Sequence, residues 1–230
     1  MGPPVCIWCL SRGIRSKGSS TMARGMRSKR WGQRPPAFTG VDFGHPMARA
    51  LCFCLTMDKM FNVIPLDYGP KRLPLTNNSM TVSASSQPTR NGNYQVVDVT
   101  RVGGANYSIP VTPFFTSGNV PHSIFFLGAC DAKANNPGND LINIGSYIVN
   151  QHILLTIQGS SLIHSLWGND LSGTWSPANG VAGTGGSSYY PGRRRVYVNG
   201  AIVASDTYSS LNLSATPTFR QIFGGNSAQL

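Results

Sequence analysis

The stretch that decides the fold runs from Arg193 to Gly225 and reads RRRVYVNGAIVASDTYSSLNLSATPTFRQIFGG. Two short runs rich in β-branched and aromatic residues, 196–198 and 201–204, flank the pair Asn199-Gly200. Asn-Gly between such runs predicts a β-hairpin, because a type I′ turn needs a positive φ at both central residues. A third run, 219–223, ends at a glycine pair and predicts another strand. The stretch therefore predicts antiparallel β-structure.

Similar runs continue toward the N-terminus. They lie at 94–99, 123–128, 141–149, 152–158 and 161–167. A long segment rich in Gly and Ser, 168–192, separates them from the hairpin and is predicted to be a loop. Strand runs about 8–12 residues apart with turn signals between them are typical of an all-β protein. We expect a two-sheet antiparallel jelly-roll sandwich.

The charge is concentrated at the N-terminus. The chain of 230 residues carries a formal net charge of +11. Residues 1–40 contain no acid and eight bases: Arg12, Arg15, Lys17, Arg24, Arg27, Lys29, Arg30 and Arg34. We therefore expect two parts, a disordered basic tail rich in Gly, Ser, Arg and Pro at 1–60 and a β-sandwich domain at 61–230. The tail is a candidate for contact with nucleic acid or another anionic surface.

Two groups of residues resemble laminin-G-like and concanavalin-A-like jelly-roll domains. One is the hairpin with its following strand, RRRVYVNGAIVASDTY and FRQIFGG. The other joins 143–147 and 154–158 to the segment Leu166-Trp-Gly-Asn-Asp-Leu171. The resemblance covers roughly residues 120–225. It departs at the strand before the hairpin, where this chain has the Gly- and Ser-rich segment, and after Gly225, where the family usually continues with one more strand.

The sequence argues against an enzyme. Concanavalin-A-like glucanases, to which the chain is similar, use two neighbouring carboxylates, normally glutamates. This chain contains no Glu, and its eight Asp residues are scattered. His122, His152 and His164 lie on or beside predicted strands without ligand spacing, so each is expected to be partly buried or on the surface rather than a catalytic base. A non-catalytic recognition module is the leading hypothesis.

Such a module would bind a carbohydrate, as a lectin does, or a protein through loops at one edge of the sandwich. The candidate ligand-binding residues are Trp167, Asn169, Asp170, Trp175, Tyr189 and Tyr190. A candidate Ca²⁺ loop at 131–140 offers hard oxygen donors from Asp131, Asn135, Asn139 and Asp140. Turn formation also explains Asn, Asp and Gly at these places and is the favoured interpretation, so ligand and Ca²⁺ binding there stay hypotheses.

A virion structural protein is the alternative hypothesis. A basic arm on a jelly roll is also the layout of viral coat proteins, in which the arm contacts nucleic acid and the sandwich assembles into a shell with copies of itself or other chains. The two hypotheses place the protein outside the cell or in a virion. No apolar run approaches the length of a membrane span, so no transmembrane segment is expected.

Overall fold

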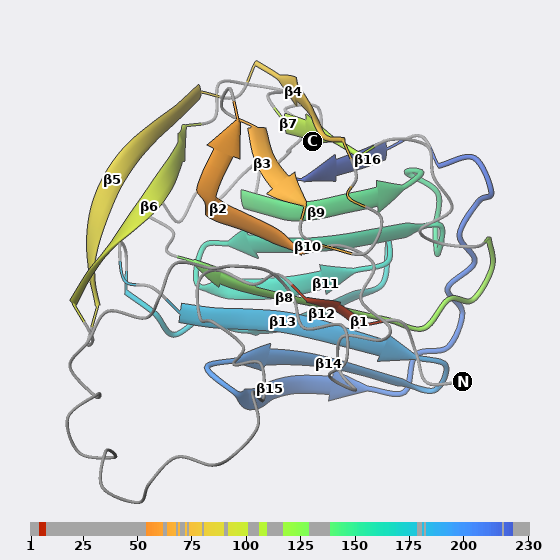
Figure 1. Cartoon of the computed structure of the whole chain (residues 1–230). Helices are drawn as coiled ribbons and strands as arrows, with labels where there is room; N and C mark the ends of the chain where they lie inside the picture. Colours follow the sequence, from red (N-terminus) through yellow and green to blue (C-terminus); the bar gives the residue numbers. More distant parts are fainter. Residues whose placement is uncertain are drawn as a thin grey trace, which may run out of the picture.

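The computed structural model describes residues 5–7, 54–61, 64–67, 69, 72, 74–79, 81–89, 92–100, 106–109, 117–128, 139–178, 181, 183–217 and 219–222. Every regular element in these ranges is a β-strand. The strands form two large sheets and two separate hairpins (Figure 1). The predicted all-β fold is therefore confirmed. No helix in the described part of the chain is long and apolar enough to span a membrane.

The first large sheet has five strands in the order β1-β8-β13-β14-β15. Its strands are β1 (Val5–Ile7), β8 (His122–Gly128), β13 (Gly183–Tyr190), β14 (Arg193–Val198) and β15 (Ala201–Asp206). All neighbours in it are antiparallel except β1 and β8. The predicted hairpin joins β14 to β15, and both turn residues have positive φ, 50° at Asn199 and 82° at Gly200.

The second large sheet has seven strands in the order β12-β11-β10-β9-β16-β7-β4. Its strands are β12 (Asp170–Thr174), β11 (Ser161–Ser165), β10 (His152–Gln158), β9 (Asn139–Gly145), β16 (Phe219–Ile222), β7 (Asn106–Ser108) and β4 (Thr76–Asn78). Thus β16, the last described strand in the sequence, lies inside the sheet between β9 and β7. The two remaining hairpins pair β2 (Leu55–Phe61) with β3 (Ile64–Asp67) and β5 (Thr81–Thr89) with β6 (Gly92–Thr100).

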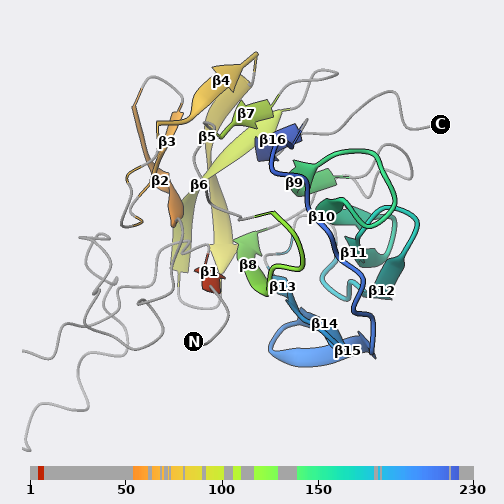
Figure 2. The same cartoon turned by 90° about the vertical axis from the view of Figure 1, so that its right-hand side faces the viewer.

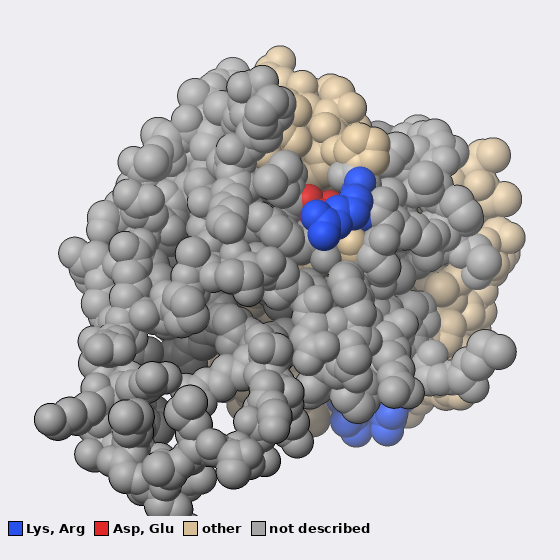
Figure 3. All heavy atoms as spheres, viewed as in Figure 1, with Lys and Arg blue, Asp and Glu red and all other residues tan. Residues whose placement is uncertain are grey.

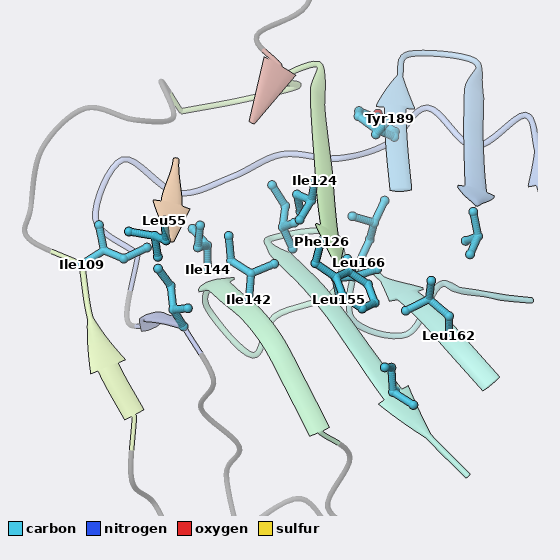
Figure 4. Packing of buried hydrophobic residues seen from close by; sticks show 14 of the residues in the cluster. Leu55, Ile109, Ile124, Phe126, Ile142, Ile144, Leu155, Leu162, Leu166 and Tyr189 are labelled. Atoms are coloured by element: carbon cyan, nitrogen blue, oxygen red, sulfur yellow. The ribbon is translucent and has the colours of Figure 1, made fainter. Parts of the chain in front are cut away.

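The core lies between the two large sheets, which form two rows of strands in Figure 2. Side chains alternate along β14 between buried and more exposed positions, as expected for a strand with one face on the core. Ile124 and Phe126 of β8 meet Ile142 and Leu155 of the facing sheet (Figure 4). Burial of these aliphatic and aromatic side chains is the main favourable contribution to folding.

The prediction that 168–192 is a loop is wrong, because the segment contains both β12 and β13. Its glycines have a packing role. A Cβ at Gly185 would lie 2.5 Å from the Phe126 ring and 2.9 Å from the Trp175 ring, and one at Gly186 would lie 2.3 Å from Phe125. Only a residue without a side chain lets these rings lie against the strand. The Gly-rich composition that indicated a loop is here a requirement of close packing.

Two other boundaries also differ from the expected ones. The predicted strand at 141–149 ends at Gly145, and a turn follows it. Within the segment predicted as tail, β2 begins at Leu55, a fully buried core residue, and Val5–Ile7 pair with β8. Most of residues 1–53, including all eight basic residues of 1–40, lies outside the described part, so the disorder of the tail stays a prediction.

Candidate functional site

Three loops meet at one end of the sandwich. They are 146–151 between β9 and β10, 166–169 between β11 and β12, and 207–217 after β15. We call these three segments the loop cluster. Asn150 joins them through its backbone, because its N–H donates to the Leu166 carbonyl at 2.9 Å and its carbonyl accepts from the Asn212 N–H at 2.7 Å.

The side chain of Asn150 completes the connection. Its Oδ1 accepts hydrogen bonds from Asn169 Nδ2 at 2.8 Å and from the hydroxyl of Tyr208. Asn150 has a φ of 66°, a left-handed conformation that Asn tolerates better than most residues. One residue thus connects all three loops by hydrogen bonds, so the loop cluster is an ordered structure.

An aromatic pair lies on the loop cluster. The rings of Tyr147 and Trp167 are stacked with centroids 4.5 Å apart and an interplanar angle of 28°, and both side chains are half-buried. Trp167 has a φ of 55°, and its N–H donates to Ser165 Oγ at 3.1 Å. Next to this pair, Ile148 and Val149 are 54% and 56% exposed. The cluster therefore presents a fixed apolar surface to solvent.

His152 supports the aromatic pair from the protein interior. Its ring packs edge-on against both Tyr147 and Trp167, with centroids 5.3 Å and 5.7 Å away. Its Nε2–H donates to Asn143 Oδ1 at 2.7 Å. Burial lowers the pKa of His152 to about 4, so the ring is neutral at neutral pH. The aromatic pair is therefore packed against an uncharged histidine ring.

A buried ion pair fixes the loop 166–169 to the other sheet. The Arg194 side chain is 1% exposed and donates through Nε and Nη2 to the carboxylate of Asp206, with an Nη2–Oδ2 distance of 2.6 Å. Its Nη1 donates to the carbonyls of His164 at 3.2 Å and Asn169 at 2.7 Å. The Tyr208 ring lies 5.1 Å from the guanidinium carbon. Arg194 therefore positions the loop that carries Trp167.

Beside Arg194, two histidines connect the sheets. His122 of β8 donates from Nδ1 to the Val120 carbonyl at 3.0 Å, which leaves its Nε2 as an acceptor for His164 Nε2–H of β11 at 3.3 Å. Burial lowers the pKa of His122 to about 4. Burial, followed by the nearby His122 and Arg194, lowers the pKa of His164 well below its usual value. We call His122, His164, Arg194 and Asp206 the polar seam.

The structure brings some of the predicted ligand-binding residues together and separates others. Trp167, Asn169 and Asp170 lie in or directly after the loop 166–169. Trp175 and Tyr189 were predicted to bind the ligand, but they are only 2% and 1% exposed. That prediction is wrong because both rings belong to the core.

Both buried rings have protein partners. Trp175 is stacked on Phe126 at 5.5 Å, and Tyr189 is stacked on His122 at 5.4 Å (Figure 4 includes Tyr189). The Tyr189 hydroxyl also donates to Asn119 Oδ1 at 2.5 Å. Tyr190, at the end of β13, is 51% exposed, and its role in binding stays a prediction.

The sequence did not indicate Tyr147, Asn150 or Tyr208 as site residues. Tyr147 was inside a run predicted as strand, and the left-handed turn at Asn150 has no glycine to signal it. The only available signal was Asn150 itself, since Asn at the end of an apolar run often begins a turn.

The predicted calcium loop is described only at its end. Asp131 and Asn135 lie outside the described residues, and Asn139 and Asp140 begin β9 rather than ending a loop. Within the described ranges, no three His, Cys, Asp or Glu side chains gather in a way that could hold a metal ion. Calcium binding stays a prediction.

Comparison with known proteins gives likenesses of fold only. No family model matches the chain, and no curated protein matches it. Domain 4 of an extracellular arabinanase from Geobacillus stearothermophilus, solved with arabinotriose, matches with a TM-score of 0.41 and 18% identity over 66% of this chain and 78% of that one. Domains LG4-5 of the mouse laminin alpha1 chain match with a TM-score of 0.36 and 16% identity over 60% of this chain and 44% of that one.

Proposed function

We propose that the protein is a non-catalytic recognition module that binds carbohydrate through the loop cluster. The observation that carries the proposal is the stacked, half-buried pair of Tyr147 and Trp167 at the end of the sandwich. An aromatic surface can lie against the apolar face of a sugar ring, and nearby polar groups can then fix its hydroxyls. Asn169 and the exposed Asp170 lie two and three residues after Trp167 and are such groups.

Rigidity supports the same proposal. Asn150 joins the three loops, and Arg194 fixes one of them to the opposite sheet. A surface that is already ordered loses little conformational entropy when a ligand binds. The contacts around Tyr147 and Trp167 therefore favour a preformed site.

The non-catalytic part of the proposal is supported by the residues themselves. The chain has no glutamate, and the histidines described near the loop cluster are buried and neutral. A buried neutral histidine with a pKa near 4 is a poor proton acceptor for a solvent-exposed substrate. The virion hypothesis depends on the eight basic residues of 1–40, which lie outside the described residues, and stays a prediction.

A glycan array probed with the full chain tests the proposal. We expect binding of at least one glycan class by the unmodified protein and a loss of about tenfold or more in the Trp167→Ala variant. The matched control is Ile202→Ala, because Ile202 is 52% exposed but lies beside the Asn199-Gly200 turn, at the other end of β15. Binding to no glycan, or equal loss in both variants, would contradict the proposal.

A further inference from the structure

The loop cluster contains no positive charge, although the chain as a whole is strongly basic. The segments 146–151, 166–169 and 207–217 contain no Lys, Arg or His. The charged residues that border them are both acidic. Asp170, directly after 166–169, is exposed, and Asp206, directly before 207–217, has a side chain that is 33% exposed.

The arginine that contacts this cluster cannot reach a ligand. Arg194 is 1% exposed, and each of its three donor groups already has a protein acceptor, either the Asp206 carboxylate or a backbone carbonyl. Its charge is neutralised by Asp206 at 2.6 Å. Arg194 therefore contributes order to the site and no free cation.

The neighbouring arginines face elsewhere. Arg193 and Arg195 flank Arg194 on β14, and Arg194 points into the sandwich. Because successive side chains of a strand point to opposite faces, Arg193 and Arg195 point to the outer face of the five-stranded sheet. On the face drawn in Figure 3, described Lys and Arg side chains lie near the centre, beside an acidic side chain, and at the lower edge.

The charges around the loop cluster indicate which ligands it can accept. A sulfate, phosphate or carboxylate brought to the loop cluster would meet the exposed Asp170, and the three described segments offer no free cation to pair with it. Like charges brought together at an interface cost free energy and exclude such partners. A sugar hydroxyl, in contrast, can donate to a carboxylate in a charge-assisted hydrogen bond.

We infer that the loop cluster takes a neutral saccharide and discriminates against sulfated, phosphorylated and uronic or sialic acid glycans. The inference rests on the proposed function and names the substrate class of the same site. Binding at the loop cluster would therefore differ from any binding of anionic polymers by the basic tail. Eight of the 19 Lys and Arg residues are in residues 1–40, which contain no acid, so this segment is the expected main source of attraction to anionic polymers.

The test compares matched glycan pairs that share a backbone and differ only in a sulfate or a carboxylate. The full chain, its Trp167→Ala variant and the Ile202→Ala control are each measured at low and high salt. We expect the neutral member of a pair to bind about tenfold or more better through a Trp167-dependent contact. Anionic binding that is salt-sensitive and unchanged in Trp167→Ala is also expected, because salt screens the attraction between the basic residues of 1–40 and an anionic glycan.

A second variant tests the role of the carboxylate without touching the core. Asp170→Asn should weaken binding of the neutral glycan and reduce the discrimination against its anionic partner. Preferential, Trp167-dependent binding of the anionic member would overturn the inference and leave the proposed function in place. Binding of no glycan at all would overturn the proposed function and the inference together.

Discussion

Two tryptophans near each other in the sequence occupy opposite regions of the molecule. Trp175 is 2% exposed between the sheets, where its ring is stacked on Phe126 and lies against Gly183 and Gly185. Trp167 is half-buried on the loop cluster, where its ring is stacked on Tyr147. The two rings differ in exposure because the segments next to them differ. Glycines make space for Trp175 in the core, whereas the turn at Trp167 leaves its ring at the edge.

The polar groups of the two regions differ in the same way. In the polar seam the charge of Arg194 and the rings of His122 and His164 are enclosed by both sheets. Beside the loop cluster, at the start of β12, Asp170 is exposed. Side-chain chemistry alone therefore does not identify a binding site. The position of the strand or turn that carries an aromatic or charged residue determines whether its side chain is buried in the core or exposed to a ligand.

The largest difference between the two regions is expected from truncating the two tryptophans. Trp175→Ala should lower the free energy of unfolding by about 3–5 kcal/mol, because it leaves a cavity beside Phe126. Trp167→Ala should cost much less stability and act mainly on binding. Urea unfolding followed by circular dichroism measures both. Equal destabilisation by the two variants would contradict the division into core and edge.

The second largest effect on the free energy of unfolding is expected from lowering the pH, which acts on the polar seam. The pKa values of His122 and His164 are lower in the folded protein than the usual value near 6.5, so the unfolded chain binds more protons as the pH falls. Stability is therefore full above about pH 6.5 and is lost as the pH falls toward 4. We expect His122 to account for a loss on the order of 1–2 kcal/mol between pH 7 and 5, and His164 to add a loss in the same direction.

Unfolding in urea at a series of pH values checks this dependence. His164→Gln is the matched variant, because it removes one titrating ring from the seam and should make the profile less steep. A free energy of unfolding that stays constant between pH 7 and 5 would contradict the burial of neutral histidines.

Two aspartates give the smallest and most closely matched comparison. Asp206→Asn removes the charge that pairs with the buried Arg194 and should cost about 1.5–2 kcal/mol. Asp170→Asn changes an exposed carboxylate and should alter stability by less than about 0.5 kcal/mol. Thermal unfolding of the two variants measures the difference. A larger loss for Asp170→Asn would show that the assignment of the two carboxylates is reversed.

Local signals in the sequence predicted much of the fold. Asn199-Gly200 specifies its turn by backbone conformation alone, and the apolar runs of β8 and β10 are visible without knowledge of their partners. The strand β13 was missed because its glycines and serines are typical of a loop. What makes Gly185 a strand residue is the contact with Phe126 and Trp175, which are distant in sequence or in another element.

The candidate site was predicted in part for a similar reason. The segment Trp167 to Asp170 was found because it resembles a known pattern. Tyr147 and Asn150 join it only through stacking and through hydrogen bonds that cross from loop to loop. Such contacts depend on the arrangement of β9, β10 and β11 in one sheet, and no local pattern encodes them.

The position of β16 has a consequence for the order of events during synthesis. Residues 219–222 lie between β9 and β7, so the seven-stranded sheet stays divided into two parts until this late segment has left the ribosome. The nascent chain must keep β9 and β7 apart and unpaired along the edges that β16 later joins. Unpaired strand edges favour aggregation, and closure by such distant segments is slow. Prolonged chaperone contact during translation is therefore the expected cost of this topology.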